Sequence, residues 1–247
     1  MGEVSVRFLG SGDAFGSGGR FQTCIHVRSG TTHFLIDCGA SSLIAMKRLG
    51  LDPSLIDIVL LTHLHGDHFA GLPFLIMEAQ YVSRREKPLV VAGPPGLEDR
   101  INEAMEVLYP GSSQTQREFT LKFVELPSET AITLGPLVIT PYDVVHPSGV
   151  PSYALRVACE GKIIAYSGDT EWTDTLIQAA QGADLFVCEC YFFEKRSRYH
   201  LDYQTLLKHR TELKCHRLIL THMSDEMLRQ IQSLNIEGAE DGESFIL

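Results

Sequence analysis

The run Thr62-His63-Leu64-His65-Gly66-Asp67-His68 constrains this chain more than any other part of its sequence. It places three imidazoles and a carboxylate close together, and these groups are typical ligands of Zn²⁺, Mn²⁺ or Fe²⁺. The apolar segment Ile58-Val59-Leu60-Leu61 comes directly before it and has the length of a short buried strand. A lone histidine is more often structural, but several ligand-type side chains at one strand end predict a metal site.

Four other apolar segments of strand length also end near a residue that can bind a metal. These residues are Asp37 after Phe34-Leu35-Ile36, His146 after Val144-Val145, Asp169 after Ile163-Ile164-Ala165-Tyr166, and His222 after Leu218-Ile219-Leu220. In layered α/β folds, loops at the carboxyl ends of the strands form the ligand site, so these strand ends can meet at one rim. Taken singly, Asp37 and Asp169 are explained equally well as turn residues.

The order of these residues resembles the metallo-β-lactamase superfamily, in which a His-x-His-x-Asp-His motif is followed by His, Asp and His. The likeness spans nearly the whole chain and includes a buried Asp before the motif. It implies an α/β fold of the αββα sandwich type, with two mixed β-sheets face to face and helices outside. Because ligands at positions 37 and 222 must meet in one site, we expect residues 1–247 to form a single domain.

The resemblance also assigns the ligands of two divalent metal ions, with Zn²⁺ expected before Mn²⁺ or Fe²⁺. His63, His65 and His146 hold one ion, Asp67, His68 and His222 hold the other, and Asp169 bridges them. Such ions lie about 3.5–4 Å apart and lower the pKa of a shared water, which supplies hydroxide at neutral pH. Asp37 is expected to orient a ligand histidine. Asp67 and Asp37 are therefore counted with the catalytic residues.

Two further segments resemble the paired Glu and His motifs of the ribonuclease Z branch. They are Cys188-Glu189-Cys190-Tyr191 and His200-Leu201-Asp202-Tyr203. In that branch the His protonates the leaving group and the Glu orients the His, which implies catalytic roles for His200 and Glu189. The alternative is a surface strand residue at Glu189 and a helix-terminal residue at His200. The basic cluster 195–198 just before His200 offers Arg196 or Arg198 to a phosphate oxygen.

A glycine-rich stretch, residues 10–20, follows the first predicted strand. No helical pattern and no Lys-Ser or Lys-Thr pair follows it, which argues against a P-loop and favours a flexible turn at the rim of the site. A Gly-x-Gly loop shortly before Arg20 is also similar to the amino-terminal signature of ribonuclease Z-like phosphodiesterases.

The remaining pattern predicts the other strands and helices. Strands are expected at 3–9, 22–28, 31–37, 58–61, 88–92, 119–125, 130–133, 137–142, 152–158, 162–167, 184–190 and 217–221. Helices are expected at 42–49, from Leu72 through Ala79, at 97–108, before Gly182 and at 203–213. Ser41 or Ser42 is expected to cap the 42–49 helix, and Asp202 the 203–213 helix.

Charge and cysteine usage narrow the setting of this chain. The net charge of −10 repels polyanions, so extended nucleic-acid binding is disfavoured. The six cysteines mostly lie in apolar runs and are expected to be buried free thiols, as in a reducing cytosol. Neither a secretory signal nor a long apolar span is visible, so we expect a cytoplasmic protein without a membrane segment.

The interval between His146 and Asp169 bears on the substrate. Bacterial ribonuclease Z carries there a long arm that grips tRNA, whereas residues 147–168 of this chain hold only a turn and two predicted strands. The resemblance thus implies a homodimeric phosphodiesterase that cleaves small or cyclic phosphodiesters through a metal-bridging hydroxide, with His200 as general acid. The alternatives are a tRNA 3′-end endonuclease, a thioester or lactone hydrolase on the same metals, and a binding protein without turnover.

Overall fold

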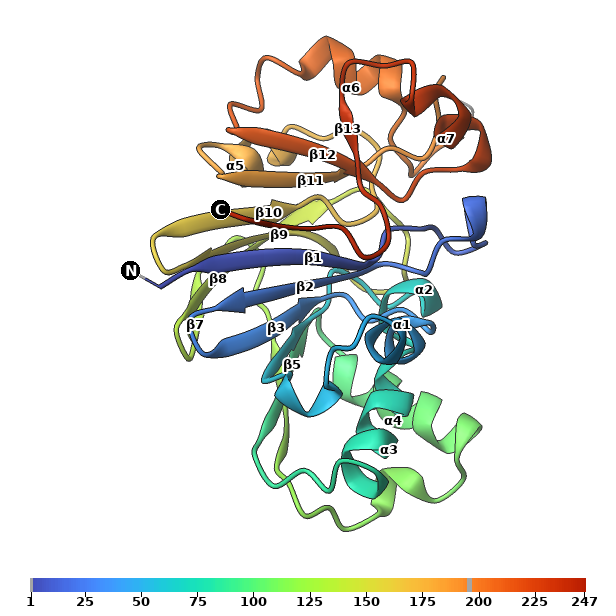
Figure 1. Cartoon of the computed structure of the whole chain (residues 1–247), viewed down its shortest axis with the longest axis vertical. Coiled ribbons are helices and arrows are strands. Elements are labelled where there is room, and N and C mark those ends of the chain that lie inside the picture. The colour runs from blue at the N-terminus through green and yellow to red at the C-terminus, as the bar shows by residue number, and fades with distance from the viewer. Residues whose placement is uncertain (1, 195–196) are drawn as a thin grey trace.

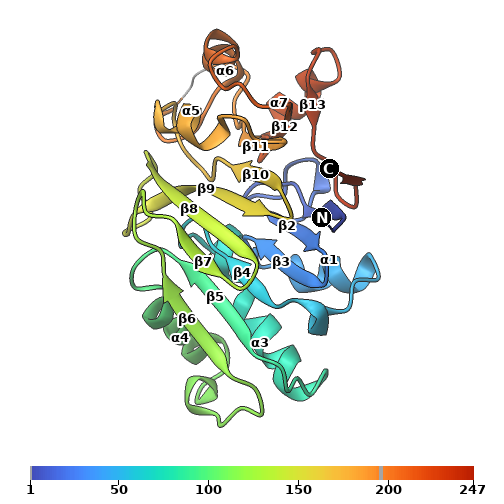
Figure 2. The same ribbon diagram turned by 90° about the vertical axis from the view of Figure 1, so that its left-hand side faces the viewer.

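The computed structural model describes residues 2–194 and 197–247, and its strands form two seven-stranded sheets. The first sheet has the order β14-β1-β2-β3-β4-β5-β6, and the second has the order β13-β12-β11-β10-β9-β8-β7. The two sheets stack face to face, with α1, α3 and α4 on the outer side of the first and α5, α6 and α7 beside the second (Figures 1 and 2). The αββα sandwich expected from the sequence is confirmed.

The bounds of the elements are as follows. The strands are β1 (Val4–Gly10), β2 (Cys24–Ser29), β3 (Thr32–Ile36), β4 (Ile58–Leu60), β5 (Leu89–Gly93), β6 (Leu121–Glu125), β7 (Ile132–Leu134), β8 (Leu137–Val144), β9 (Ser152–Cys159), β10 (Lys162–Tyr166), β11 (Leu185–Glu189), β12 (Arg217–Thr221), β13 (Glu237–Gly238) and β14 (Ser244–Ile246). The helices are α1 (Ser42–Arg48), α2 (Gly66–Phe69), α3 (Leu72–Tyr81), α4 (Leu97–Leu108), α5 (Thr175–Ala180), α6 (Tyr203–His209) and α7 (Asp225–Ile231), with short 3-10 turns at Ser17–Gly19, Pro53–Leu55 and Ser112–Gln114.

Three apolar clusters hold the layers together. The cluster between the sheets takes side chains from both, including the fully buried Phe8, Phe34, Tyr153 and Tyr166. A second cluster joins the outer face of the first sheet to α1, α3 and α4, and a third joins the second sheet to α5, α6 and α7. Alternating side chains of each strand therefore face either the inner or an outer cluster, as two-sided burial of a sheet requires.

Both sheets combine antiparallel hairpins with parallel strands. β3, β4 and β5 are parallel neighbours in the first sheet, and β10, β11 and β12 are parallel neighbours in the second. The carboxyl ends of parallel strands lie at one edge of a sheet. The segments after β3, β4, β10 and β12, which carry Asp37, His63, Asp169 and His222, consequently meet at one rim of the sandwich.

The structure corrects several of the predicted elements, including the short helix α2, which was not predicted. The 203–213 helix ends at His209 as α6, and the sequence analysis predicted nothing after His222, where α7, β13 and β14 lie. Asp202 caps α6 by accepting a hydrogen bond from the Thr205 amide at 2.8 Å. Ser41 stands at the N-cap of α1 but makes no capping bond, because its hydroxyl accepts the Gln22 amide instead, at 2.8 Å.

Two further expectations concern the chain as a whole. All six cysteines are free, and all but the half-buried Cys215 are buried. Among the described residues, no helix is both long and apolar enough to cross a bilayer.

Candidate metal centre

The structure brings the seven predicted ligands together in two adjoining groups. Within each group the candidate ligand atoms lie within 4.8 Å of one another. The first group consists of His63, His65 and His146, and the second of Asp67, His68, Asp169 and His222. No cysteine belongs to a candidate group among the described residues.

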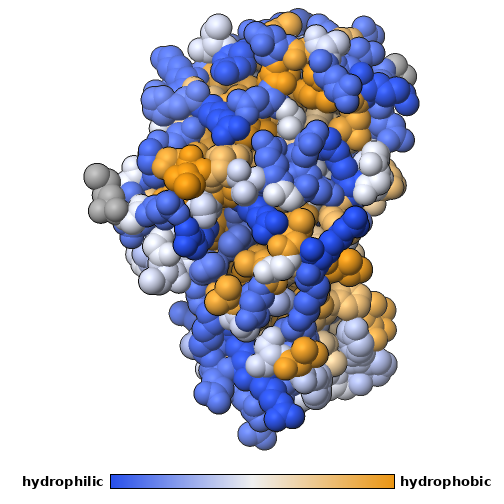
Figure 3. Space-filling model, in the orientation of Figure 1, coloured by the Kyte–Doolittle hydropathy of each residue, from blue (hydrophilic) through white to orange (hydrophobic). Residues whose placement is uncertain are grey.

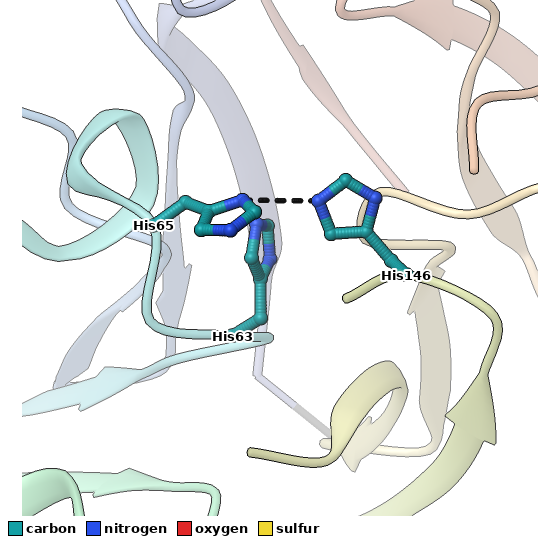
Figure 4. A group of neighbouring side chains, drawn as sticks. All are labelled: His63, His65 and His146. Carbon is teal, nitrogen blue, oxygen red and sulfur yellow. Dashed lines mark hydrogen bonds between the residues drawn. The ribbon is translucent and has the colours of Figure 1, made fainter. Parts of the chain in front are cut away.

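The first group consists of imidazoles from two separate segments, and their rings point toward one another (Figure 4). Nε2 of His146 lies 3.0 Å from Nδ1 of His65, and Nδ1 of His146 lies 3.0 Å from the carbonyl oxygen of Tyr199. Burial lowers the pKa of His146 to about 4 and that of His63 well below its ordinary value. These rings are therefore neutral near pH 7 and offer lone pairs to a cation.

Asp169 lies between the two groups. Its carboxylate oxygens are 3.3 Å from Nε2 of His68 and 3.4 Å from Nε2 of His222 in the second group. The same carboxylate is 3.9 Å from Nε2 of His146 and 4.0 Å from Nε2 of His63 in the first group. This is the position that a carboxylate bridging two ions would occupy.

Several buried polar atoms of this cluster have no hydrogen-bond partner, although buried polar groups normally find one. They include Nε2 of His63, Nε2 of His68 and Oδ1 of Asp169. Nε2 of His68 lies 3.2 Å from Asp67 and 3.3 Å from Asp169, yet it makes no hydrogen bond with either. Imidazole lone pairs and carboxylates that converge in one buried place, several of them without a hydrogen-bond partner, fit a pair of divalent cations.

Asp37 lies behind the second group, and the exposure of its side chain to solvent is zero. Its carboxylate accepts the Thr62 amide at 2.8 Å and contacts Nδ1 of His68 at 2.7 Å. Donation of the His68 Nδ1–H to Asp37 leaves Nε2 free to face the ion, so Asp37 fixes both the tautomer and the ring orientation. This is the orienting position expected for Asp37.

Glu189 and His200 form a pair at the edge of the cluster. Nδ1 of His200 lies 3.2 Å from Oε2 of Glu189, and Glu189 also accepts the Thr170 amide. Burial disfavours the charged imidazole, but the Glu189 carboxylate outweighs burial and raises the pKa of His200. Glu189 is fully buried, so the alternative of a surface strand residue is wrong. His200 lies in the loop before α6 rather than in the helix.

A cavity of about 270 Å³ opens onto both metal groups and His200. Sequence reasoning missed its aromatic walls, which are Phe15 from the glycine-rich loop and Tyr191 and Phe192 after β11. Phe15 is 83% exposed, which is unusual for a large apolar side chain. The one feature of the sequence that could have indicated its role in the cavity was its place in the glycine-rich loop at the rim.

The basic cluster 195–198 falls partly outside the described residues, because Lys195 and Arg196 are not among them. Arg198 is exposed and packs over the ring of Tyr199, 5.0 Å from its centroid. The described residues that line the cavity include Ser197 but no lysine or arginine. Trp172 stacks on His209 with ring centroids 4.1 Å apart and is not among the residues that line the cavity.

Comparison with known proteins agrees with this geometry. Residues 4–241 match the model of the family described as anti-Pycsar protein Apyc1. Ribonuclease Z of Lachnoclostridium phytofermentans is 27% identical over 279 aligned residues, which cover 92% of this chain and 89% of that protein.

Solved structures show the same fold. The metallo-β-lactamase fold protein YhfI from Bacillus subtilis superposes with a TM-score of 0.79 at 22% identity, covering 99% of this chain and all of that one. The short form of human tRNase Z superposes with a TM-score of 0.77 at 25% identity, covering 98% of each chain. This chain is therefore a metal-dependent hydrolase of the metallo-β-lactamase fold and the ribonuclease Z-like branch, and it belongs to the anti-Pycsar protein Apyc1 family.

Proposed function

We propose that this protein is a dinuclear metal phosphodiesterase that hydrolyses small or cyclic phosphodiesters. The observation that carries the proposal is the pair of the buried Glu189 and the partly exposed His200 directly beside the two ligand groups. The ring of His200 is close to the ligands, because its centroid lies 5.0 Å from that of His146 and 5.7 Å from that of His222. A protonated group at this distance suits an alkoxide leaving group, whereas the thiolate released by a thioester hydrolase needs no strong acid.

The seven ligands named above would hold the two ions, with Asp169 between them. Two divalent ions bound there would activate a water molecule for attack on phosphorus and neutralise the charge of the phosphate oxygens. Asp37 keeps Nε2 of His68 directed at its ion. Glu189 accepts the Nδ1–H of His200, and Nε2 of His200 gives its proton to the leaving oxygen as the phosphorus–oxygen bond breaks.

The short interval between His146 and Asp169 supports a compact substrate. Residues 152–159 and 162–166 of this interval form β9 and β10, a hairpin of the second sheet. The alignment with the Lachnoclostridium ribonuclease Z has 279 positions but uses 92% of this 247-residue chain, so about 50 positions of that relative have no counterpart here. A shorter chain with an acidic net charge of −10 has less surface for a long polyanion.

The second candidate is a ribonuclease Z that cleaves the 3′ end of tRNA precursors. It is favoured by relatives of this chain, which include ribonucleases Z at 24–27% identity over most of their length. The same metals, Glu189 and His200 would serve that reaction, and the two candidates differ in how the substrate is gripped.

A hydrolysis panel separates these candidates. The metal-loaded enzyme would be given cyclic nucleotides, a nitrophenyl phosphodiester, a thioester and a tRNA precursor, each at low and at physiological salt. We expect fast cleavage of the small diesters with a weak salt dependence, because few phosphates are neutralised. Efficient cleavage of the tRNA precursor with a steep loss at physiological salt would establish the endonuclease instead.

Elemental analysis tests the metal assignment. The reconstituted chain should hold two ions, and Asp169→Ala should lose the shared position and most of the activity. One ion or none in the wild-type chain would contradict the proposal. Zinc as the native metal, the homodimer and the cytoplasmic location stay predictions from the resemblance, and solution scattering with the mass of one chain would remove the homodimer.

A further inference from the structure

The glycine-rich loop at the rim of the site is held by carboxylates of the chain itself. Asp13 within the loop is fully buried and accepts the Ser17 amide at 2.9 Å and the Ser17 hydroxyl at 2.7 Å. Asp225 of α7 accepts the Gly18 amide at 2.8 Å. These amides are the groups that a phosphate-binding loop would turn toward a ligand, and here internal carboxylates use them.

Asp241 holds the base of the same loop from the far end of the chain. Its carboxylate accepts the amide and the hydroxyl of Ser11, both at 2.8 Å, and the Phe21 amide at 2.7 Å. Arg20 adds a second link, because its Nη1 donates to the Ser11 hydroxyl at 3.0 Å and to the carbonyl oxygen of Ala239. Ser11 itself is completely buried.

The other side of Ser11 contacts a metal ligand. The carbonyl oxygen of Ser11 accepts the His222 amide at 3.1 Å and the Thr221 hydroxyl at 3.1 Å. His222 has a φ of 55°, a left-handed conformation that costs a non-glycine residue about 1–3 kcal/mol. The backbone at His222 therefore keeps this conformation only while its surroundings, Ser11 among them, hold it.

We propose that Asp241 is a positioning residue for the metal group of Asp67, His68 and His222. Asp241 fixes Ser11, and Ser11 fixes the backbone of His222, so that the imidazole is aimed at its ion before the ion arrives. This inference rests on the proposed function, because it takes His222 as a metal ligand. The inference predicts an effect on one ligand group alone. None of the three histidines of the other group makes a hydrogen bond to Ser11, Arg20 or Asp241.

The chain offers a matched control two residues further on. Glu243 lies in the same turn, and its carboxylate accepts the Glu240 amide at 3.3 Å. Neither carboxylate oxygen of Glu243 contacts the glycine-rich loop. Glu243→Ala thus removes a carboxylate from the same segment without touching Ser11.

The test is a Co²⁺ titration of the metal-free full-length chain, followed by visible absorption and by calorimetry. Wild type and Glu243→Ala should bind two ions with the same affinities. Asp241→Ala should bind the ion held by His63, His65 and His146 as wild type does. It should bind the ion held by Asp67, His68 and His222 about 10–100-fold more weakly. Asp241→Asn keeps an acceptor oxygen and should fall between Asp241→Ala and wild type.

Each other outcome overturns something definite. Unchanged affinity for both ions in Asp241→Ala, or an equal loss at both, would overturn the positioning role. If Asp241→Ala does not fold, Asp241→Asn decides, and wild-type affinity for the second ion in that variant overturns the inference. A wild-type chain that binds fewer than two ions overturns the proposed function and this inference with it.

Discussion

Asp37 and His222 both have left-handed backbone conformations, with φ angles of 59° and 55°. Each follows directly on a strand end, and each places its side chain at the metal centre rather than continuing along the sheet. Strained non-glycine residues persist only where their surroundings determine them, as Thr62 and His68 do for Asp37. The strain at these two residues is thus part of how the ligands are held.

The sequence predicts the metal ligands better than it predicts the residues that hold those ligands in place. His63, His65, Asp67 and His68 stand out because ligand-type side chains cluster within one short run. Asp241 could not be predicted in the same way, since it acts through a backbone amide and a serine hydroxyl that are 230 positions away. Sequence patterns report side-chain chemistry, and this contact depends on where the folded chain places a backbone group.

The leaving-group dependence of His200→Ala tests its role at the residue scale. With alkyl diesters, turnover should fall about 10²–10⁴-fold, because the leaving alkoxide loses its proton donor. With a nitrophenyl diester the loss should be much smaller, since nitrophenolate leaves without a proton. Steady-state kinetics on both substrates, with metal content measured in parallel, make the comparison.

The matched variant for this prediction is His209→Ala, because His209 stacks on Trp172 outside the cavity. It should leave both rates unchanged. An equal loss on both substrates in His200→Ala would assign His200 another role, such as holding a ligand in place.

Strand positions were predicted closely because apolar runs stop at glycine, proline or polar residues. β12 and α4 coincide with their predicted ranges, whereas α7, β13 and β14 were not predicted. The last two are only two and three residues long, too short for a periodic pattern. They form as strands because β12 and β1 offer edges with which to pair.

The turn after β10 gives a prediction at the scale of elements. Gly168 has a φ of 59°, and a Cβ atom there would lie 2.5 Å from the carbonyl oxygen of Tyr153. Gly168→Ala should therefore lower the free energy of unfolding by about 2–5 kcal/mol, from the left-handed conformation and from overpacking together. Urea unfolding measures this loss.

Gly182 separates the two causes. Its φ is 64°, but a Cβ atom there would meet nothing within 4 Å. Gly182→Ala should lose only the conformational part, about 1–2 kcal/mol. Equal losses at the two glycines would show that the contact with Tyr153 has no energetic weight.

The hairpin of β2 and β3 predicts a pH dependence of stability. His26 is 7% exposed, and its Nε2 lies 3.0 Å from Nδ1 of His33. Burial, with His33, Arg7 and Arg28 nearby, lowers the pKa of His26 from 6.5 to about 4. The folded state thus binds fewer protons than the unfolded state between these values, so stability is full above pH 6.5 and falls toward pH 4.

Unfolding of wild type and His26→Gln at pH 7.5 and pH 4.5 measures this effect. Wild type should lose about 1–3 kcal/mol more than the variant between the two pH values. The exposed His216 provides the control substitution His216→Gln, which should follow wild type. A pH dependence that is the same in His26→Gln and wild type would contradict the prediction.

At the scale of the molecule, the two sheets depend on one another. The cluster between them takes side chains from both, and the metal groups draw ligands from loops of both. The amino-terminal β1 pairs with the carboxy-terminal β14, and the chain end marked C lies beside β1 in Figure 1. The space-filling view from the same side shows hydrophobic and hydrophilic residues interspersed over this face (Figure 3). We propose on this basis that the chain folds as a single domain.

That proposal predicts one cooperative unfolding transition for the metal-free protein. The calorimetric enthalpy should equal the van't Hoff enthalpy, because loss of either sheet exposes the shared cluster. Two separate transitions by calorimetry would show that the sheets are independent domains. Metal should then raise the midpoint of the single transition, as any ligand of the folded state does.

The bond between Ser11 and Asp241 also has a consequence for the time at which this protein becomes active in a cell. A ribosome needs about 10–50 s to make the 230 positions between them, at about 5–20 residues per second. His63, His65 and His146 have all been made well before His222 and Asp241. Because the two sheets share one cluster, a nascent chain holds the ligands of both ions in place only when translation is almost finished.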